Sequence, residues 1–78
     1  MIIADIKPQT DLSLIITSTD GRIGRFDVQP YLGYEAFAAL HDYSEFLKVH
    51  NGSYFVEWDC GADLSADTIE AKLTSVPD

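Results

Sequence analysis

The short length of the chain limits its fold most, because 78 residues can enclose only one hydrophobic core. A domain of this size buries only about 60% of the surface that its unfolded chain exposes, so its stability is small and a partner often adds to it. Apolar residues make up 46% of the chain, which is normal for a globular protein and too high for a disordered one. We therefore expect a single domain over residues 1–78.

The first third of the chain has the pattern of a β-hairpin preceded by a strand. Residues 2–7 predict a strand that Pro8 ends, and residues 12–17 alternate in polarity as a half-buried strand does. A two-residue loop at Asp20-Gly21 would set the apolar faces of the hairpin against each other. A three-residue loop over 19–21 pairs Leu14 with Phe26 and lets both strands bury one face, with Gly21 in the left-handed conformation.

A second hairpin is predicted around Asn51-Gly52, a preferred pair for the type I′ turn. A two-residue loop at this place puts Val49 opposite Tyr54 and leaves Trp58 on the same apolar face. Both Tyr54 and Trp58 are therefore expected in the core.

Two helices complete the predicted fold. Helical spacing of apolar residues predicts a short helix over residues 34–42, whose inward side carries Ala36, Phe37 and Leu40. Ser65 is a good N-cap for a C-terminal helix, and we interpret residues 59–63 as the turn from the preceding strand into this helix. Ile69 and Leu73 are expected to face the sheet, and Pro77 to end the fold.

The predicted class is therefore α+β. It has a small, mainly antiparallel sheet of two hairpins plus the N-terminal strand, a short middle helix and a C-terminal helix.

The charge of the chain is acidic and uneven. The net charge is −8, of which −2 lies in residues 1–41 and −6 in residues 42–78. Such a surface repels phosphate groups, so we expect no direct contact with nucleic acid. Acidic charge that only keeps the domain soluble is the simpler explanation, and a binding surface for a small basic protein is the alternative.

The chain has no sign of a membrane or secreted protein. No apolar run approaches the roughly 18 residues needed to span a membrane, and residues 1–7 do not resemble a secretory signal. The single cysteine, Cys60, cannot form an internal disulfide. We therefore expect a cytoplasmic location.

Each residue that could carry chemistry lacks a necessary companion. Neither His41 nor His50 has another histidine or a cysteine three or four positions away, although Asp42 and Glu45 lie close to His41 in the sequence. Acidic neighbours of Cys60 disfavour its thiolate form. Glu57 and Asp59 could share one face of a strand. Acid–base catalysis would also need a cleft that gives the two carboxyl groups different pKa values, and nothing in the sequence predicts such a cleft. We predict no catalytic, cofactor-binding or metal-binding residue, and expect no enzyme.

Four residues are the candidates for contact with a partner: Tyr31, Tyr34, Asp59 and Asp63. The tyrosines flank Gly33 in a predicted loop, and aromatic residues are enriched at protein interfaces. The aspartates belong to the more acidic half of the chain. A homodimer through an edge strand, with Ile2-Ile3 as the candidate, is also left open.

Motifs distributed over nearly the whole chain resemble the domain-of-unknown-function family 2442. They are Leu14-x-Ile16, Asp20-Gly21, Phe26-Asp27-Val28, Leu40, Phe46, Val49, Gly52, Trp58 and Gly61-x-Asp63-Leu64-Ser65-x-Asp67-x-Ile69. Thr17 departs mildly, since members often have Phe near that place. The resemblance implies a bacterial α+β domain without established activity, found alone or joined to a helix-turn-helix, and also in gene pairs similar to toxin–antitoxin modules.

Three functions follow as hypotheses. The first is a non-enzymatic interaction or regulatory domain, antitoxin-like, that binds a small basic protein. The second is a ligand-sensing domain with a pocket between the sheet and the helix over residues 34–42. The third, the least favoured, is a small hydrolase that uses Cys60 or the pair Glu57 and Asp59.

Overall fold

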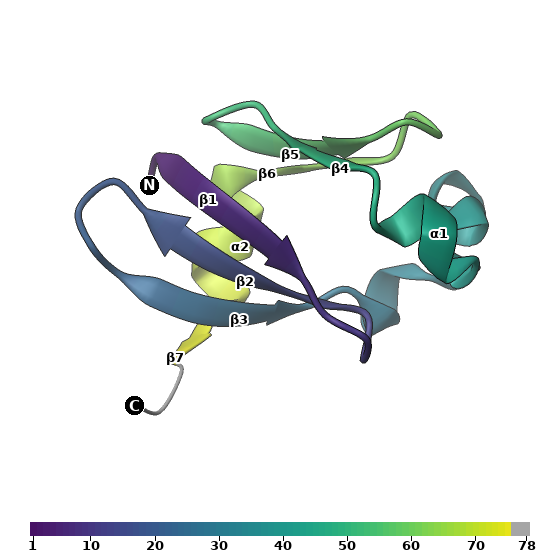
Figure 1. Ribbon diagram of the computed structural model, residues 1–78, viewed down its shortest axis with the longest axis horizontal. Helices are drawn as coiled ribbons and strands as arrows, with labels where there is room; N and C mark the ends of the chain where they lie inside the picture. Colours follow the sequence, from purple (N-terminus) through teal and green to yellow (C-terminus); the bar gives the residue numbers. More distant parts are fainter. Residues whose placement is uncertain (76–78) are drawn as a thin grey trace.

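The computed structural model describes residues 1–75 and has the predicted α+β class, with its strands divided between two antiparallel sheets (Figure 1). The first sheet has the order β1-β2-β3-β7, and its strands are β1 (Ile3–Pro8), β2 (Ser13–Ser18), β3 (Ile23–Asp27) and β7 (Thr74–Ser75). The second has the order β4-β5-β6, and its strands are β4 (Val49–Asn51), β5 (Phe55–Trp58) and β6 (Asp63–Ser65). The antiparallel pairing was predicted, but its division between two sheets was not.

The helices are short. They are the 3₁₀ helices η1 (Gln29–Tyr31) and η2 (Glu35–His41) and the α-helices α1 (Tyr43–Phe46) and α2 (Ala66–Lys72). The predicted middle helix exists as η2, which buries Phe37 and Leu40 but leaves Ala36 exposed. Within residues 1–75, no helix is long and apolar enough to cross a membrane.

The first hairpin has the predicted register. Leu14 lies opposite Phe26, and Ser18 N–H donates to Arg22 O at 2.8 Å, so the loop comprises residues 19–21. Gly21 has a φ of 93°, as the loop geometry requires. Strand β1 pairs with the edge of β2 that faces away from β3.

The second hairpin exists, but its predicted register was wrong. Val49 lies opposite Trp58, and Gly52 N–H donates to Phe55 O at 2.9 Å, so the loop has moved to residues 53–54. Tyr54 is 67% exposed instead of belonging to the core, whereas Trp58 is buried as predicted.

Asn51 explains this shift, because its side chain makes a tertiary contact instead of forming the turn. Its Nδ2 donates to Ile3 O at 3.0 Å, and its Oδ1 accepts from Ser53 N–H at 2.8 Å. Ile3 N–H donates in turn to Ser53 O at 2.8 Å. Because both backbone groups of Ile3 are engaged, pairing with a second copy would need a part of β1 beyond this residue.

A third hairpin, absent from the prediction, joins β5 to β6. Trp58 N–H donates to Ala62 O at 2.9 Å, and Gly61 has a φ of 94° in the three-residue loop between them. Residues 59–61 therefore turn the chain into another strand before α2 begins. The predicted cap of α2 is confirmed, because Ser65 Oγ accepts from Thr68 N–H at 3.1 Å.

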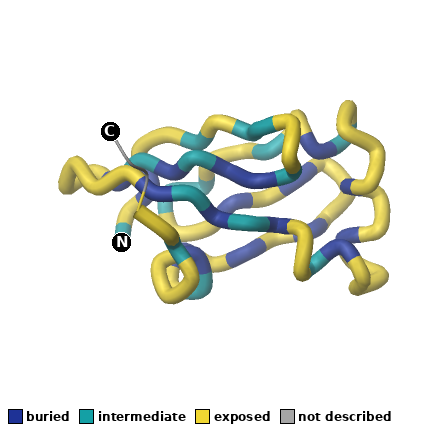
Figure 2. The backbone as a smooth tube through the Cα atoms, turned by 90° about the horizontal axis from the view of Figure 1, so that it is seen from below, coloured by how far each residue is buried: buried dark blue, intermediate teal, exposed yellow. Residues whose placement is uncertain are grey.

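One hydrophobic core is shared by both sheets and by η2, α1 and α2, and Tyr31 of η1 packs against it as a partly buried residue. Figure 2 shows buried and exposed positions interspersed along the backbone. In β5 they alternate, and Val56 and Trp58 are the buried residues. The Trp58 ring lies 6.0 Å from that of Phe46, and its Nε1–H donates to Phe46 O at 2.9 Å. Ile69 and Leu73 bring α2 to this core.

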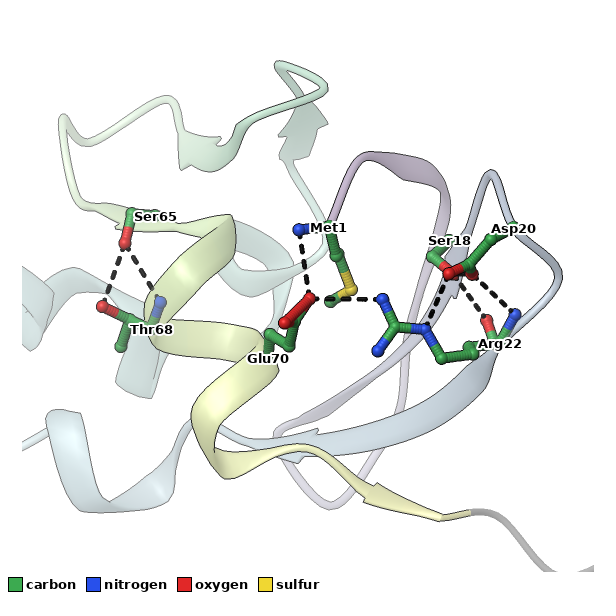
Figure 3. A network of polar contacts seen from close by, with 7 residues as sticks. All are labelled: Met1, Ser18, Asp20, Arg22, Ser65, Thr68 and Glu70. Carbon is green, nitrogen blue, oxygen red and sulfur yellow. Dashed lines mark hydrogen bonds and ion pairs between the residues drawn. The ribbon is translucent and has the colours of Figure 1, made fainter.

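A polar network fastens α2 to the first hairpin (Figure 3). Glu70 Oε1 lies 3.0 Å from the amino group of Met1 and 3.2 Å from Arg22 Nη2. Arg22 Nε also lies 2.9 Å from Asp20 Oδ2 in the hairpin loop. The helix begins directly after β6 and leads into β7, so α2 connects the two sheets along the chain, and Glu70 adds ion pairs to the side of the first sheet.

Candidate functional site

Tyr31 and Tyr34, predicted as contact residues, line a surface pocket of about 240 Å³. Two of its other walls are close to Tyr31 in the sequence, and two come from the distant C-terminal part of the chain. They are Asp27 at the end of β3, Pro30 in η1, Lys72 at the end of α2 and Thr74 in β7. We call these six residues the tyrosine pocket. It lies where β3 meets β7, and Tyr34 is the one residue of the predicted helix over 34–42 that lines it.

The two tyrosines differ in how firmly they are held. The Tyr31 ring stacks on Phe26 with centroids 5.8 Å apart and leans on Phe37 at 5.7 Å. Tyr34 is 63% exposed, and its ring lies 6.4 Å from that of Tyr31. The pocket therefore has one aromatic wall set by the core and one that faces solvent.

Two opposite charges line the same pocket without meeting. Neither Asp27 nor Lys72 takes part in an ion pair within the part of the chain that the structure describes, so their charged atoms are more than 4.0 Å apart. Asp27 Oδ1 accepts from Gln29 N–H at 3.0 Å, which fixes the carboxylate at the start of η1.

Asp59 and Asp63 lie elsewhere, at the hairpin between β5 and β6. Asp63 is directly opposite Glu57, which is also directly opposite His50 on the other side. These three exposed side chains form a row across the outer face of the second sheet. Asp59 lies at the end of this row, with its Oδ1 2.5 Å from His50 Nε2. We call these four residues the acidic face.

An exposed aromatic residue lies beside the acidic face. Phe55 has the same orientation as Glu57 in β5 and is paired with Ser65. Its ring covers Gly52, since a Cβ on that glycine would lie 2.3 Å from Phe55 Cζ. An apolar group thus lies on the same face of β5 as Glu57.

The four predicted contact residues do not form one site. The structure brings each pair into a separate surface, and it adds Asp27 and Lys72 to the tyrosines and Glu57 and His50 to the aspartates. No local sequence signal marked Asp27 or Lys72, which are 45 positions apart in the chain. The exposure of Glu57 could be predicted from the sequence, because alternate residues of β5 face solvent.

The remaining candidates for chemistry take part in ordinary contacts or lie at the surface. His41 Nε2–H donates to Leu32 O at 3.0 Å, because a carbonyl can only accept. Cys60 is exposed in the loop before Gly61. Within residues 1–75, no three His, Cys, Asp or Glu side chains are grouped as metal ligands would be.

Comparison with known proteins identifies a family without adding a described function. The model of a family described as "Protein of unknown function (DUF2442)" matches residues 3–75, nearly the whole chain. This match confirms the resemblance drawn from the sequence motifs. No curated protein and no solved structure matches the chain.

Proposed function

The chain belongs to the DUF2442 family, whose members are described only as proteins of unknown function, and from this premise we propose that it is a non-enzymatic interaction domain. Its partner is a small basic protein of the bacterial cytoplasm, bound by the acidic face in the manner of an antitoxin. The observation that carries the proposal is the direct cross-strand pairing of Glu57 with Asp63.

This pairing is unfavourable in the isolated protein. Like charges directly opposite each other in an antiparallel pair have Cβ atoms about 5 Å apart and repel. A partner that places Lys or Arg side chains over this row converts the repulsion into attraction. The acidic face therefore gains more from a basic partner than acidic residues scattered over the surface would.

The exposed side chain of the neighbouring Phe55 supports the proposal that the partner is a protein. Protein interfaces combine an apolar centre with a polar rim, and aromatic residues are enriched in them. Phe55 supplies an exposed ring beside the carboxylates, on strands that are anchored from below by the buried Val56 and Trp58. A rigid sheet also loses little conformational freedom on binding.

Coexpression with the product of the neighbouring gene tests the proposal. We expect the two proteins to copurify at low salt and the double variant Glu57→Gln/Asp63→Asn to lose most of this binding. The matched control is Asp5→Asn/Glu35→Gln, which removes the same charge from two exposed acids that form no ion pair within residues 1–75. Equal binding by both double variants would show that the acidic face is not the contact surface.

The same variants give a second measurement on the isolated protein. Removing the repulsion between positions 57 and 63 should raise the free energy of unfolding by roughly 0.2–1 kcal/mol, measured with urea. The control variant should not gain this increment. A loss of stability in Glu57→Gln/Asp63→Asn would contradict the physical basis of the proposal.

A further inference from the structure

We propose that the tyrosine pocket binds a small zwitterion of the α-amino acid class, with an apolar or aromatic side chain. This site is separate from the acidic face, so it adds a ligand to the proposed protein interaction and does not depend on it. The proposal rests on the charges, the aromatic wall and the size of the pocket.

The charges determine the class of ligand. Asp27 and Lys72 line one pocket but form no ion pair with each other. A ligand that carried only an anion or only a cation would leave one of them unmatched. An α-amino acid has both groups on one carbon, so its carboxylate can approach Lys72 Nζ while its ammonium approaches Asp27.

The aromatic wall determines which side chain the ligand carries. Tyr31 is held by Phe26 and Phe37, so its ring is in place before a ligand arrives. Tyr34 adds a second ring 6.4 Å away, and Pro30 adds further apolar surface. An aromatic or aliphatic side chain would bury apolar area against these rings, and an aromatic one would also make favourable ring–ring contacts.

The size of the pocket limits the ligand to a small molecule. Sites for drug-sized molecules occupy about 300–1,000 Å³. The tyrosine pocket, at about 240 Å³, is smaller and is open to solvent at Tyr34. We therefore expect millimolar to submillimolar affinity rather than tight binding.

Titration of the ¹⁵N-labelled full chain with L-phenylalanine, followed by NMR, tests the proposal. Two derivatives with the same ring separate the charges: N-acetyl-L-phenylalanine lacks the ammonium, and L-phenylalanine amide lacks the carboxylate. We expect saturating shift changes at residues 27–34 and 72–74 with L-phenylalanine. Each derivative should bind about tenfold more weakly, as loss of a charge-assisted hydrogen bond predicts.

Variants locate the site. Lys72→Gln and Asp27→Asn should each weaken binding of L-phenylalanine about tenfold. Asparagine keeps the oxygen that accepts from Gln29 N–H, so the fold of η1 is preserved. The matched controls are Lys7→Gln, another exposed lysine, and Tyr54→Ala, which removes a tyrosine as exposed as Tyr34. Tyr34→Ala should weaken binding, whereas both controls should leave it unchanged.

Three results would overturn the proposal. The first is the absence of saturable shift changes at millimolar L-phenylalanine. The second is equal affinity for N-acetyl-L-phenylalanine, which would make the pocket a carboxylate site without a role for Asp27. The third is unchanged binding in Lys72→Gln. None of these results bears on copurification through the acidic face, so the two proposals fail separately.

Discussion

Gly21 and Gly61 occupy the same position in two three-residue hairpin loops. Their φ values are 93° and 94°, and each follows an acidic residue of its loop by one or two positions. A side chain at such a φ meets its own backbone, so only glycine adopts it without cost. Register identified the first of these loops in the sequence. The second, Asp59-Cys60-Gly61, has similar turn residues, but the sequence predicts a turn into a helix here, whereas the structure places β6 between this loop and α2.

At this scale, we expect Gly21→Ala and Gly61→Ala each to lower the free energy of unfolding by about 1–2 kcal/mol. A Cβ at either position would have no neighbour within 4 Å, so the loss would come from the backbone alone. Gly33→Ala is the control, because it has equal space and no positive φ. Urea denaturation measures all three variants. Similar stability of Gly33→Ala and Gly61→Ala would refute the assigned role of φ.

Among the elements, α2 packs against β3 through a close contact between Gly24 and Leu73. A Cβ on Gly24 would lie 2.3 Å from Leu73 Cγ, too close for any real pair of atoms. To make room, Leu73 would have to change its side-chain rotamer or the chain directly after α2 would have to shift. This contact also explains why a glycine occurs in the middle of a strand, where it normally weakens the sheet.

We expect Gly24→Ala to destabilise the protein by about 1–3 kcal/mol, as overpacking does. In a Leu73→Ala background the same change should cost much less, because the obstructing side chain is gone. A double-mutant cycle with urea denaturation measures this coupling. Additive effects of the two substitutions would show that the contact does not limit the packing of α2.

At the scale of the whole molecule, four carboxyl groups within residues 1–75 have pKa values below their ordinary values of 3.8 for Asp and 4.5 for Glu. Hydrogen bonds from nearby serines are the main cause of the lowered pKa for Asp11, Asp20 and Asp42. The hydrogen bond from the Met1 amino group is the main cause of the lowered pKa of Glu70. All four groups fasten loops or helix ends.

These lowered pKa values predict the direction of acid sensitivity. The folded protein holds the four groups ionised at a pH where the unfolded chain would already bind protons. Their stabilisation is therefore complete above pH 4.5 and is lost as the pH falls through the ordinary values toward the lowered ones. We expect the free energy of unfolding to decline below about pH 4.5.

Glu70→Gln should show a smaller decline, because one of the four groups no longer titrates. Asp67→Asn, an exposed acid of the same helix outside any ion pair of residues 1–75, is the control. Urea denaturation from pH 3 to pH 7 makes the comparison. A wild-type stability that rose on acidification would contradict the prediction.

The sequence alone determined the features that depend on neighbouring residues. The register of the first hairpin, the cap at Ser65, the burial of Trp58 and the exposure of the tyrosine Tyr34 follow from alternation, turn chemistry and helix signals, which act over a few positions. The family also follows from such local motifs. Fold class could be predicted for the same reason.

Only the tertiary structure decided the rest, because it depends on contacts between distant segments. Asn51 lies outside the two-residue loop that local preference predicts, because its side chain donates a hydrogen bond to the backbone carbonyl of Ile3. The two residues are 48 positions apart in the chain. The tyrosine pocket needs Lys72 and Thr74 beside Asp27, which the packing of α2 and β7 against β3 brings about. The acidic face needs the register of β5 with both of its neighbours. Local preferences are worth about 1 kcal/mol or less per residue, so a tertiary hydrogen bond or a buried side chain can override them.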